Sequence, residues 1–321
     1  MRRPMTWPMD PARRHGLGRL GAFAAIALGP ALTPARGWAA TLAQTADGPV
    51  GSSGDSSGDG TLLRRLRFDI QCHNPTGSPL AAQPLWAYGP ASRTGHQSLV
   101  EASSSWPMTH GTDALGNTVL HWQTPPLPPH GLRAIRLDVA VRMARQPAPQ
   151  AVEPGAWLQA ERHIERDDPA IVALAAELRQ AHPRDARARV EAIYTWVRTH
   201  LNYAGYLPND LGASHALRER SGDCTEYAYL VVALCRALGL PARALGGFVV
   251  DQDDAPASVA YHNWAEVHVD GAWRLVDAQK EALFDGGERY VALRLIRDQA
   301  LGPMGLAHRF VTDGPAQIRW R

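Results

Sequence analysis

Short alternations of apolar and polar residues fill the chain from Leu62 to about Met143. They include the segments LRRLRFDIQ, QPLWAY, QSLVEASSSW, NTVLHWQ and LRAIRLDVAVRM, which turn-forming clusters such as NPTGSP and GPASRTG separate. Alternation with a period of two is typical of a β-strand with one buried face. Regular short strands joined by Pro- and Gly-rich turns predict a small antiparallel β-sandwich over residues 61–145.

The pattern becomes helical after a Pro-rich hinge at residues 146–166. The segments DDPAIVALAAELRQAH and RDARARVEAIYTWVRTHL carry apolar residues at helical spacing, and a third helix begins at Cys224 and ends near Gly239. The segments ARALGGFVV and YHNWAEVHVDGAWRLVDAQ then alternate like strands. Helices followed by antiparallel strands predict an α+β domain over residues 167–300, with a C-terminal extension at residues 301–321.

Composition describes an ordinary globular protein of about two domains. The chain has 321 residues, of which 45% are hydrophobic and 20% charged. Lys and Arg number 33 against 31 for Asp and Glu, which leaves a net charge of +2 and no basic face. Nucleic acid is therefore not an expected partner.

The first 40 residues have the pattern of a secretory signal peptide. Arg13, Arg14 and Arg19 precede a short apolar stretch, and small residues follow near Ala39. The stretch is too short for a transmembrane span, so we expect no integral span after cleavage and a periplasmic or secreted protein. The route stays open between Sec and twin-arginine export, because Gly16 stands where a twin-arginine signal usually has phenylalanine. Residues 41–60 are rich in Gly, Ser and Asp and predict a flexible linker.

Cys224 stands where a thiol gains chemical reactivity. Three cysteines leave at least one without a partner in the chain. Asp223 and Glu226 fit a capping box that makes Cys224 the first helical residue. The helix N-terminus favours a thiolate, and its free N–H groups can hold an oxyanion. The two carboxylates oppose the thiolate, so a basic partner is needed as well. We expect Cys235, in mid-helix, and Cys72, in a turn, to be inert.

A hairpin supplies that partner. Asp270–Gly271 predicts a two-residue turn between alternating strands. The resulting register sets His262 opposite Gln279 and puts Asp277 two residues away on the same face, roughly 7–8 Å distant between Cα atoms. A carboxylate there can orient the imidazole, which can activate the thiol. A metal site made of the same three residues fits less well, because the spacing matches no zinc motif.

These motifs resemble those of the transglutaminase-like superfamily, whose domain is similar to that of papain-like cysteine peptidases. The matching segments, over about residues 165–280, are GDCTEYA, LGLPAR, YHNWAEVHVDGAWRLVDAQ and IYTWVRTHLNY. The upstream strands resemble the β-domain that precedes such modules in many exported bacterial proteins. The resemblance implies a β-sandwich followed by a catalytic domain whose nucleophile helix packs on an antiparallel sheet. It also implies Cys224 as nucleophile, His262 as general base and then acid, and Asp277 as the orienting group.

One departure concerns the oxyanion. Papain-like enzymes use a glutamine shortly before the cysteine, and this chain has none there. The candidates are the backbone N–H of Cys224 and an upstream aromatic residue, which could be Tyr203, Tyr206 or Trp196. We favour Tyr203 among the aromatics. Trp264, on the same sheet face as His262, is expected to shield the His–Asp pair from water.

The resemblance implies a thiol enzyme that attacks amide bonds of a peptide or protein through a thioester. Water would resolve the thioester in a peptidase or deamidase, and an amine would do so in a cross-linking acyltransferase. We favour hydrolysis, because an exported enzyme meets water in excess. The alternative class is a non-catalytic module that binds polypeptide. No metal or cofactor is implied, no calcium-binding loop is visible, and the oligomeric state stays open.

Overall fold

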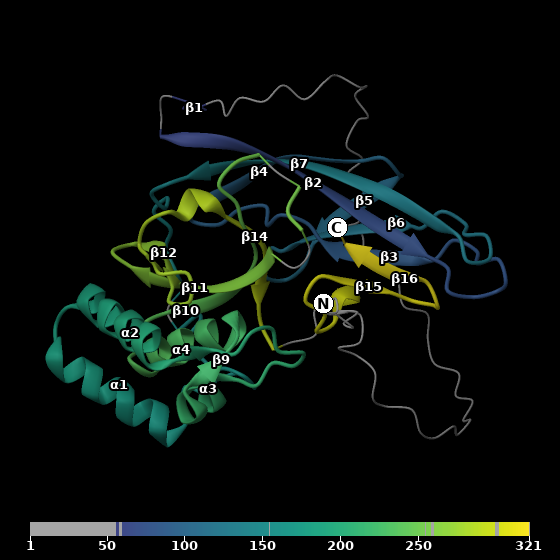
Figure 1. Cartoon of the computed structure of the whole chain (residues 1–321). Helices are drawn as coiled ribbons and strands as arrows, with labels where there is room; N and C mark the ends of the chain where they lie inside the picture. Colours follow the sequence, from purple (N-terminus) through teal and green to yellow (C-terminus); the bar gives the residue numbers. More distant parts are fainter. Residues whose placement is uncertain are drawn as a thin grey trace, which may run out of the picture.

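The computed structural model describes most of the chain beyond the first 55 residues. The described residues are 56–57, 60–153, 155–253, 255–257, 260–298 and 302–320. The predicted signal peptide and nearly all of the predicted linker lie outside them. The described residues form an α+β structure in which the helices gather at one end and a strand-rich region lies at the other (Figure 1).

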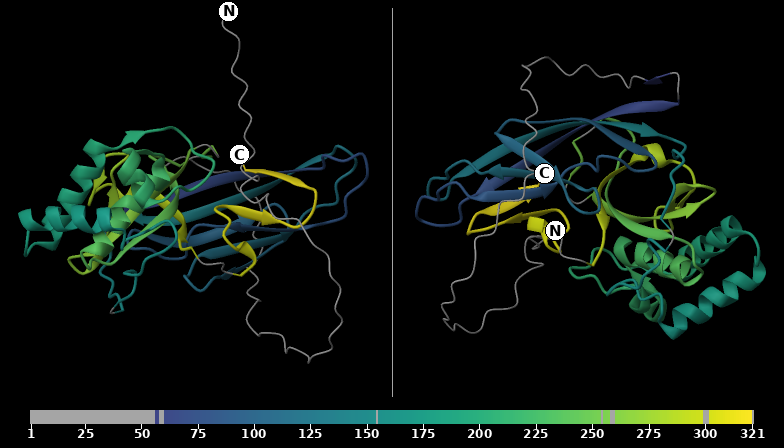
Figure 2. Two further views of the ribbon diagram at one scale, coloured as in Figure 1. Left: turned by 90° about the horizontal axis from the view of Figure 1, so that it is seen from below. Right: turned by 180° about the vertical axis from the view of Figure 1, so that it is seen from behind.

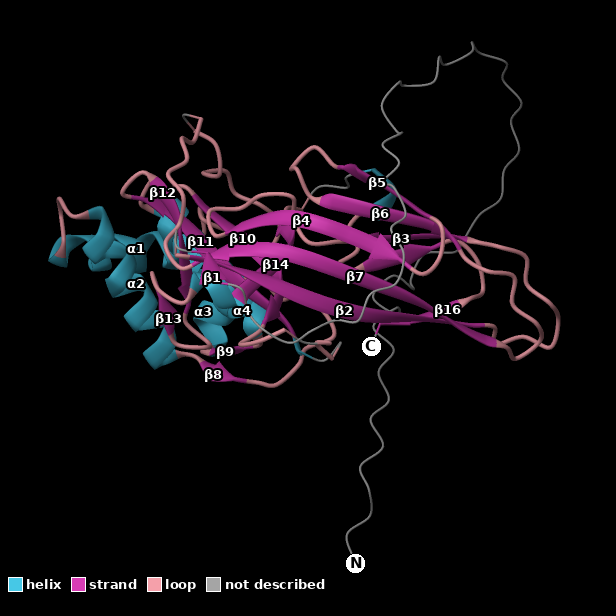
Figure 3. Cartoon of the chain, turned by 90° about the horizontal axis from the view of Figure 1, so that it is seen from above, coloured by secondary structure: helices cyan, strands magenta, loops and turns pink. Residues whose placement is uncertain are grey.

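The N-terminal region is built from two antiparallel sheets, as the alternation predicted. One contains β1 (Ser56–Ser57), β2 (Thr61–His73), β7 (Leu132–Ala144) and β4 (Gln97–Ser104) in that order, with β16 (Gln317–Trp320) paired to β2. The other has the order β15 (Phe310–Thr312), β3 (Pro84–Tyr88), β6 (Thr118–Gln123) and β5 (Met108–Thr112). Figure 3 shows the long strands β2, β7 and β4 side by side. Alternate residues of both sheets share one buried core, so the predicted sandwich is confirmed.

Cys72 differs from its predicted place. It lies inside β2, opposite Arg133, and not in a turn, because pairing with β7 extends the strand to His73. Its side chain is fully buried, and this burial raises the pKa of the thiol to about 11. Cys72 is therefore a packed, protonated thiol near neutral pH.

The end of the chain returns to the N-terminal sheets. Residues 301–321 stand apart in sequence, yet β15 pairs with β3 and β16 pairs with β2. In Figure 2 the C-terminus accordingly lies beside these strands. These pairings join residues more than 200 positions apart, which no local alternation can indicate.

The second region packs helices on a five-stranded antiparallel sheet. The helices are α1 (Pro169–Ala181), α2 (Ala186–His200), α3 (Ala213–Glu219) and α4 (Cys224–Ala237). The strand order is β13 (Ala282–Leu283), β12 (Ala272–Asp277), β11 (Tyr261–Val269), β10 (Ala242–Val249) and β14 (Tyr290–Ile296). Asp168 is the N-cap of α1, since its side chain accepts a hydrogen bond from the Ala170 N–H. α3 is a short helix that the apolar pattern did not indicate.

The five-stranded sheet lies between the helices and the sandwich. Ala244, Ala265 and Val267 on one face pack with the helices. Leu245 and Trp264 on the other face pack with Ala91 of the N-terminal region. Phe248 and Val291, toward the far end of their strands, belong to the core of the sandwich. Because α4 is buried along nearly its whole length against this sheet, its first residue is held at a fixed place above the strands.

Candidate active site

The start of α4 has the predicted capping box. Asp223 is the N-cap, and its Oδ1 accepts a hydrogen bond of 2.7 Å from the Thr225 N–H. Glu226 Oε2 accepts in return from the Asp223 N–H at 3.1 Å. Cys224 is therefore the first residue of the helix, and its side chain keeps partial exposure while Cys235 in mid-helix is fully buried.

The β11–β12 hairpin has the predicted register. Val269 pairs with Ala272, and the pairing continues outward to Ala265 with Val276. Asp270 and Gly271 both have positive φ, at 53° and 72°, which a type I′ turn requires. Beyond the paired residues, His262 Nε2 lies 2.6 Å from Asp277 Oδ2, and both side chains are buried. The hydrogen bond that the register predicted is present.

Asp277 is held by further donors. Its Oδ1 accepts from the backbone N–H groups of Gln279 and Lys280 at 3.1 and 3.0 Å. Its Oδ2 also accepts from the Tyr290 hydroxyl at 2.9 Å. Because these donors fix both oxygens, the carboxylate can in turn fix the imidazole with Nε2 toward Asp277. Nδ1 is then the ring nitrogen that is left for another partner.

The thiol of Cys224 lies against the beginning of β11. The backbone N–H of Asn263 and the hydroxyl of Thr225 both interact with it. The Thr225 hydroxyl accepts in addition from Asn263 Nδ2 at 2.8 Å, which ties α4 to the residue after His262. The structure thus brings the helix start, the first residues of β11 and the end of β12 to one place.

The electrostatic environment keeps an isolated thiol protonated. Burial, followed by the charge of Asp223, raises the pKa of Cys224 to about 12, although the Asn263 and Thr225 contacts oppose the shift. The helix N-terminus is therefore not sufficient to form a thiolate. This agrees with the prediction that the nearby carboxylates of Asp223 and Glu226 oppose the thiolate. A thiolate near neutral pH requires transfer of its proton to a base such as His262.

A change of Asp223 tests this balance. Asp223→Asn keeps an oxygen that can accept from the Thr225 N–H, and asparagine caps helices as well as aspartate. It removes a negative charge beside the sulfur, so the alkylation pKa of Cys224 should fall. The rate of iodoacetamide modification against pH measures that pKa. Asp167→Asn, an exposed site at the start of α1, is the matched control. A raised or unchanged alkylation pKa in Asp223→Asn would contradict the assigned cause.

Trp264 and Tyr203 take different positions at the site. Trp264 is buried, with its ring stacked on His262 at 6.4 Å between centroids and its edge against Tyr290 at 5.2 Å. Tyr203 is 55% exposed in β8 (Asn202–Tyr203), which pairs with β9 (Ser221–Gly222) just before the helix. The charge of Cys224 contributes to a raised pKa of Tyr203, after burial. Tyr203 thus lies at the rim of the site.

Three residues that the sequence motifs did not identify also contact the site: Tyr290, Asn263 and Thr225. Tyr290 begins β14, which pairs with β10 and not with either strand of the hairpin. No periodicity relates it to Asp277. Asn263 and Thr225 could have been identified from the sequence, because they directly follow His262 and Cys224.

The described part of the chain contains no group of three or more His, Cys, Asp or Glu side chains that could hold a metal ion. Within that same part, none of the helices has the length and apolar character needed to cross a membrane.

Comparison with known proteins finds a family model that matches the region containing the site. Residues 172–278 match the model of the transglutaminase-like superfamily. No curated protein matches the chain. A Cytophaga hutchinsonii structure described as a candidate cysteine protease is 18% identical with a TM-score of 0.53, over 81% of this chain and 91% of that one. The periplasmic domain of TgpA from Pseudomonas aeruginosa is 19% identical with a TM-score of 0.37, over 66% and 86%. Of these two, the first is similar enough to indicate a shared fold. Residues 172–278 of this chain are a transglutaminase-like domain.

Proposed function

We propose that the protein is an exported thiol enzyme that cleaves amide bonds through Cys224, His262 and Asp277. The observation that carries the proposal is the 2.6 Å hydrogen bond between His262 and Asp277, together with the contact of the Cys224 thiol with the N–H of Asn263, the residue after His262. A buried, oriented imidazole next to a thiol is what nucleophilic catalysis by cysteine needs.

The reaction begins with transfer of the thiol proton of Cys224 to Nδ1 of His262. The sulfur then attacks the carbonyl carbon of an amide, and the oxyanion accepts hydrogen bonds from the helix N-terminus, with Tyr203 as a rim candidate. His262 returns the proton to the leaving nitrogen as the C–N bond breaks, which leaves a thioester. Asp277 holds the imidazole and stabilises its charged form, and Trp264 excludes water from the pair.

Resolution of the thioester by water gives a peptidase or deamidase, which we favour because an exported enzyme meets water in excess. An amine in the place of water would give cross-linking. Mass spectrometry of a peptide mixture, with and without an added primary amine, separates the two: hydrolysis leaves new acids or shorter peptides, and transamidation leaves amine adducts.

The decisive test is the pH dependence of Cys224 alkylation in the presence and absence of His262. Cys72 and Cys235 are fully buried and should stay unmodified in the folded chain, so exposure alone singles out Cys224. We expect wild-type Cys224 to react with iodoacetamide near neutral pH. His262→Ala should move the profile strongly upward, toward the pKa of about 12 that burial imposes.

His268→Ala is the matched control, since His268 lies on the same strand and contacts the Gln150 carbonyl at 2.7 Å, away from the thiol. Identical profiles for wild type and His262→Ala would show that the imidazole does not serve the thiol. The chain would then be a non-catalytic module that keeps the fold and binds polypeptide.

A further inference from the structure

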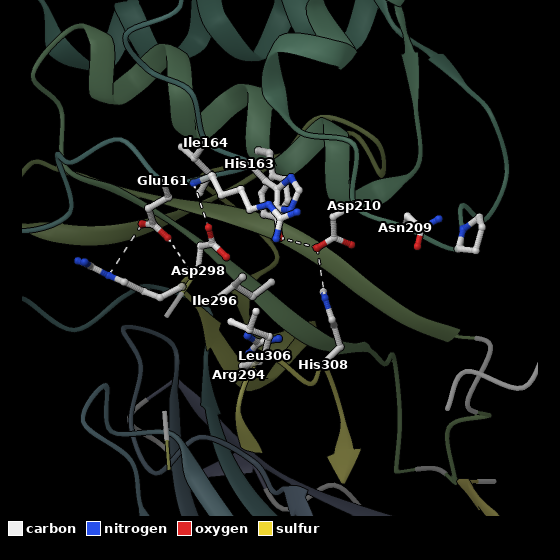
Figure 4. A pocket seen from close by; sticks show the side chains of 14 residues that line it. Glu161, His163, Ile164, Asn209, Asp210, Arg294, Ile296, Asp298, Leu306 and His308 are labelled. Atoms are coloured by element: carbon white, nitrogen blue, oxygen red, sulfur yellow. Dashed lines mark hydrogen bonds and ion pairs between the residues drawn. The ribbon is translucent and has the colours of Figure 1, made fainter. Parts of the chain in front are cut away.

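A cavity of about 390 Å³ lies between the two regions of the molecule and has no part in the proposed chemistry. Figure 4 shows its lining side chains, which come from the hinge before α1, the loop after β8, helix α4, strand β14 and the segment before β15. Its volume falls within the range of small-ligand sites. Charged and aromatic groups dominate the walls.

Arg294 is the unusual member of this lining. It lies on β14 opposite Gly246, and only 4% of the residue is exposed. Its Nε and Nη1 have no hydrogen-bond partner among the described residues. The guanidinium lies 5.4 Å from the centre of the Tyr88 ring and also interacts with the Tyr88 hydroxyl, which together offset only part of the cost of burying a charge. A buried cation without a carboxylate is expensive and points to a missing anion.

The carboxylates of the cavity are occupied by other groups. Glu161 accepts from Arg236 at 2.7 Å and from the Asp298 N–H at 2.9 Å, with Arg297 at 3.9 Å. Asp298 accepts from the Arg162 N–H at 3.2 Å. Asp210 accepts from the Tyr229 hydroxyl at 3.0 Å and pairs with His308 at 3.2 Å. None of these carboxylates forms an ion pair with Arg294, so within the described residues its guanidinium has no carboxylate partner.

We propose that this cavity binds the carboxylate of a peptide ligand, with Arg294 as the group that recognises it. The single positive charge of Arg294 can balance one negative charge on the ligand. A phosphate dianion would face the carboxylates of Asp210 and Asp298 with a second, uncompensated charge, so a monoanion is favoured. The identification of a peptide as the carrier of that carboxylate rests on the proposed function.

The cavity lies at a distance that suits this role. Tyr229, which lines it, is five residues after Cys224 on α4, about 7.5 Å further along the helix axis and about 140° around it. An extended peptide covers about 3.3–3.6 Å per residue, so two or three residues span the axial part of this separation and further residues are needed to pass around the helix. The loop that carries Asp210 is also attached to the catalytic end of the helix, because the Leu207 N–H donates to Asp223 at 3.0 Å. A chain end in the cavity would lie a few residues from the amide that the thiol attacks.

Calorimetric titration of the Cys224→Ala chain tests the proposal without turnover. The probes are the tripeptide Ala-Ala-Ala with a free carboxylate and the same tripeptide with a C-terminal amide. The free acid should bind about tenfold tighter or more, because only it offers a charged acceptor to Arg294. Arg294→Met should abolish this preference, while Arg133→Met, an exposed arginine on β7, should keep it.

A second measurement separates recognition from a structural role. If Arg294 serves a ligand, the ligand-free Arg294→Met chain should unfold at the same urea concentration as its parent or at a higher one, because a buried unpaired charge is gone. A marked loss of stability, equal affinity for acid and amide, no binding of the acid, or a preference that survives Arg294→Met would each overturn the proposal. Stronger competition by inorganic phosphate than by acetate would overturn the assignment to a carboxylate.

The proposed function can fail independently of this proposal. If the wild type is inactive but its Cys224→Ala form still prefers the free acid, only the proposed chemistry is refuted.

Discussion

Cys224→Ala is expected to abolish amide cleavage and to leave the fold intact. Without the sulfur no thioester can form, and no other cysteine can replace it because Cys72 and Cys235 are fully buried. Cys224 is the first residue of α4 and partly exposed, so the change in the free energy of unfolding should stay below about 1 kcal/mol. Cleavage of a peptide mixture followed by mass spectrometry, and urea unfolding of the same samples, measure the two quantities.

Cys235→Ala is the matched control on the same helix. Its side chain is fully buried in the core between α4 and the sheet, so the substitution leaves a cavity. It should lower the free energy of unfolding by about 1 kcal/mol or more and leave the chemistry intact. Loss of the unfolding transition in Cys224→Ala would show instead that this cysteine is structural.

Asp277→Asn is expected to preserve folding and to lower turnover strongly. Asparagine can still accept from the N–H groups of Gln279 and Lys280 through its oxygen, but its amide can hold the wrong imidazole tautomer and cannot stabilise the imidazolium. In a serine-protease triad the corresponding change lowers turnover by about 10⁴. We expect a smaller loss here, because a thiol needs less help from its base than a hydroxyl does.

The alkylation pKa of Cys224 should rise in Asp277→Asn. Two effects of the Asp277 charge on this pKa compete. The charge stabilises the His262 imidazolium, which favours the thiolate–imidazolium pair, but it also repels the thiolate and so raises the thiol pKa in the wild type. The carboxylate is in direct contact with His262 at 2.6 Å, whereas its charge ranks behind burial and Asp223 among the influences on the thiol. Loss of the contact with the imidazolium should therefore outweigh the relief of the thiolate. The shift is opposite in sign to that expected for Asp223→Asn, so the pair of variants distinguishes the roles of the two carboxylates. Wild-type turnover together with an unmoved alkylation profile in Asp277→Asn would remove Asp277 from the proposed triad.

Most of the architecture around the proposed active site could be predicted from local patterns in the sequence. The capping box at Asp223 and Glu226 depends on contacts within four residues, so the helix start at Cys224 is readable from the chain itself. The Asp270–Gly271 turn fixes the register of its two strands, because two residues with positive φ allow only one way to join them. The proximity of His262 and Asp277 follows from that register and from the alternation of side chains along each strand.

Long-range packing decided the rest. Tyr290 reaches Asp277 from a strand that pairs elsewhere in the sheet. The strands β15 and β16 return to the N-terminal sheets, and their partners lie more than 200 residues away. The raised pKa of the Cys224 thiol comes first from burial, which a sequence does not display. The burial of the Arg294 guanidinium, which leaves its Nε and Nη1 without a hydrogen-bond partner among the described residues, likewise depends on the packing around β14. The sequence by itself determined the short-range geometry, in which neighbouring residues constrain each other through turns, caps and alternation. The tertiary structure alone decided desolvation and the meeting of distant segments, because both depend on which surfaces the whole chain buries against one another.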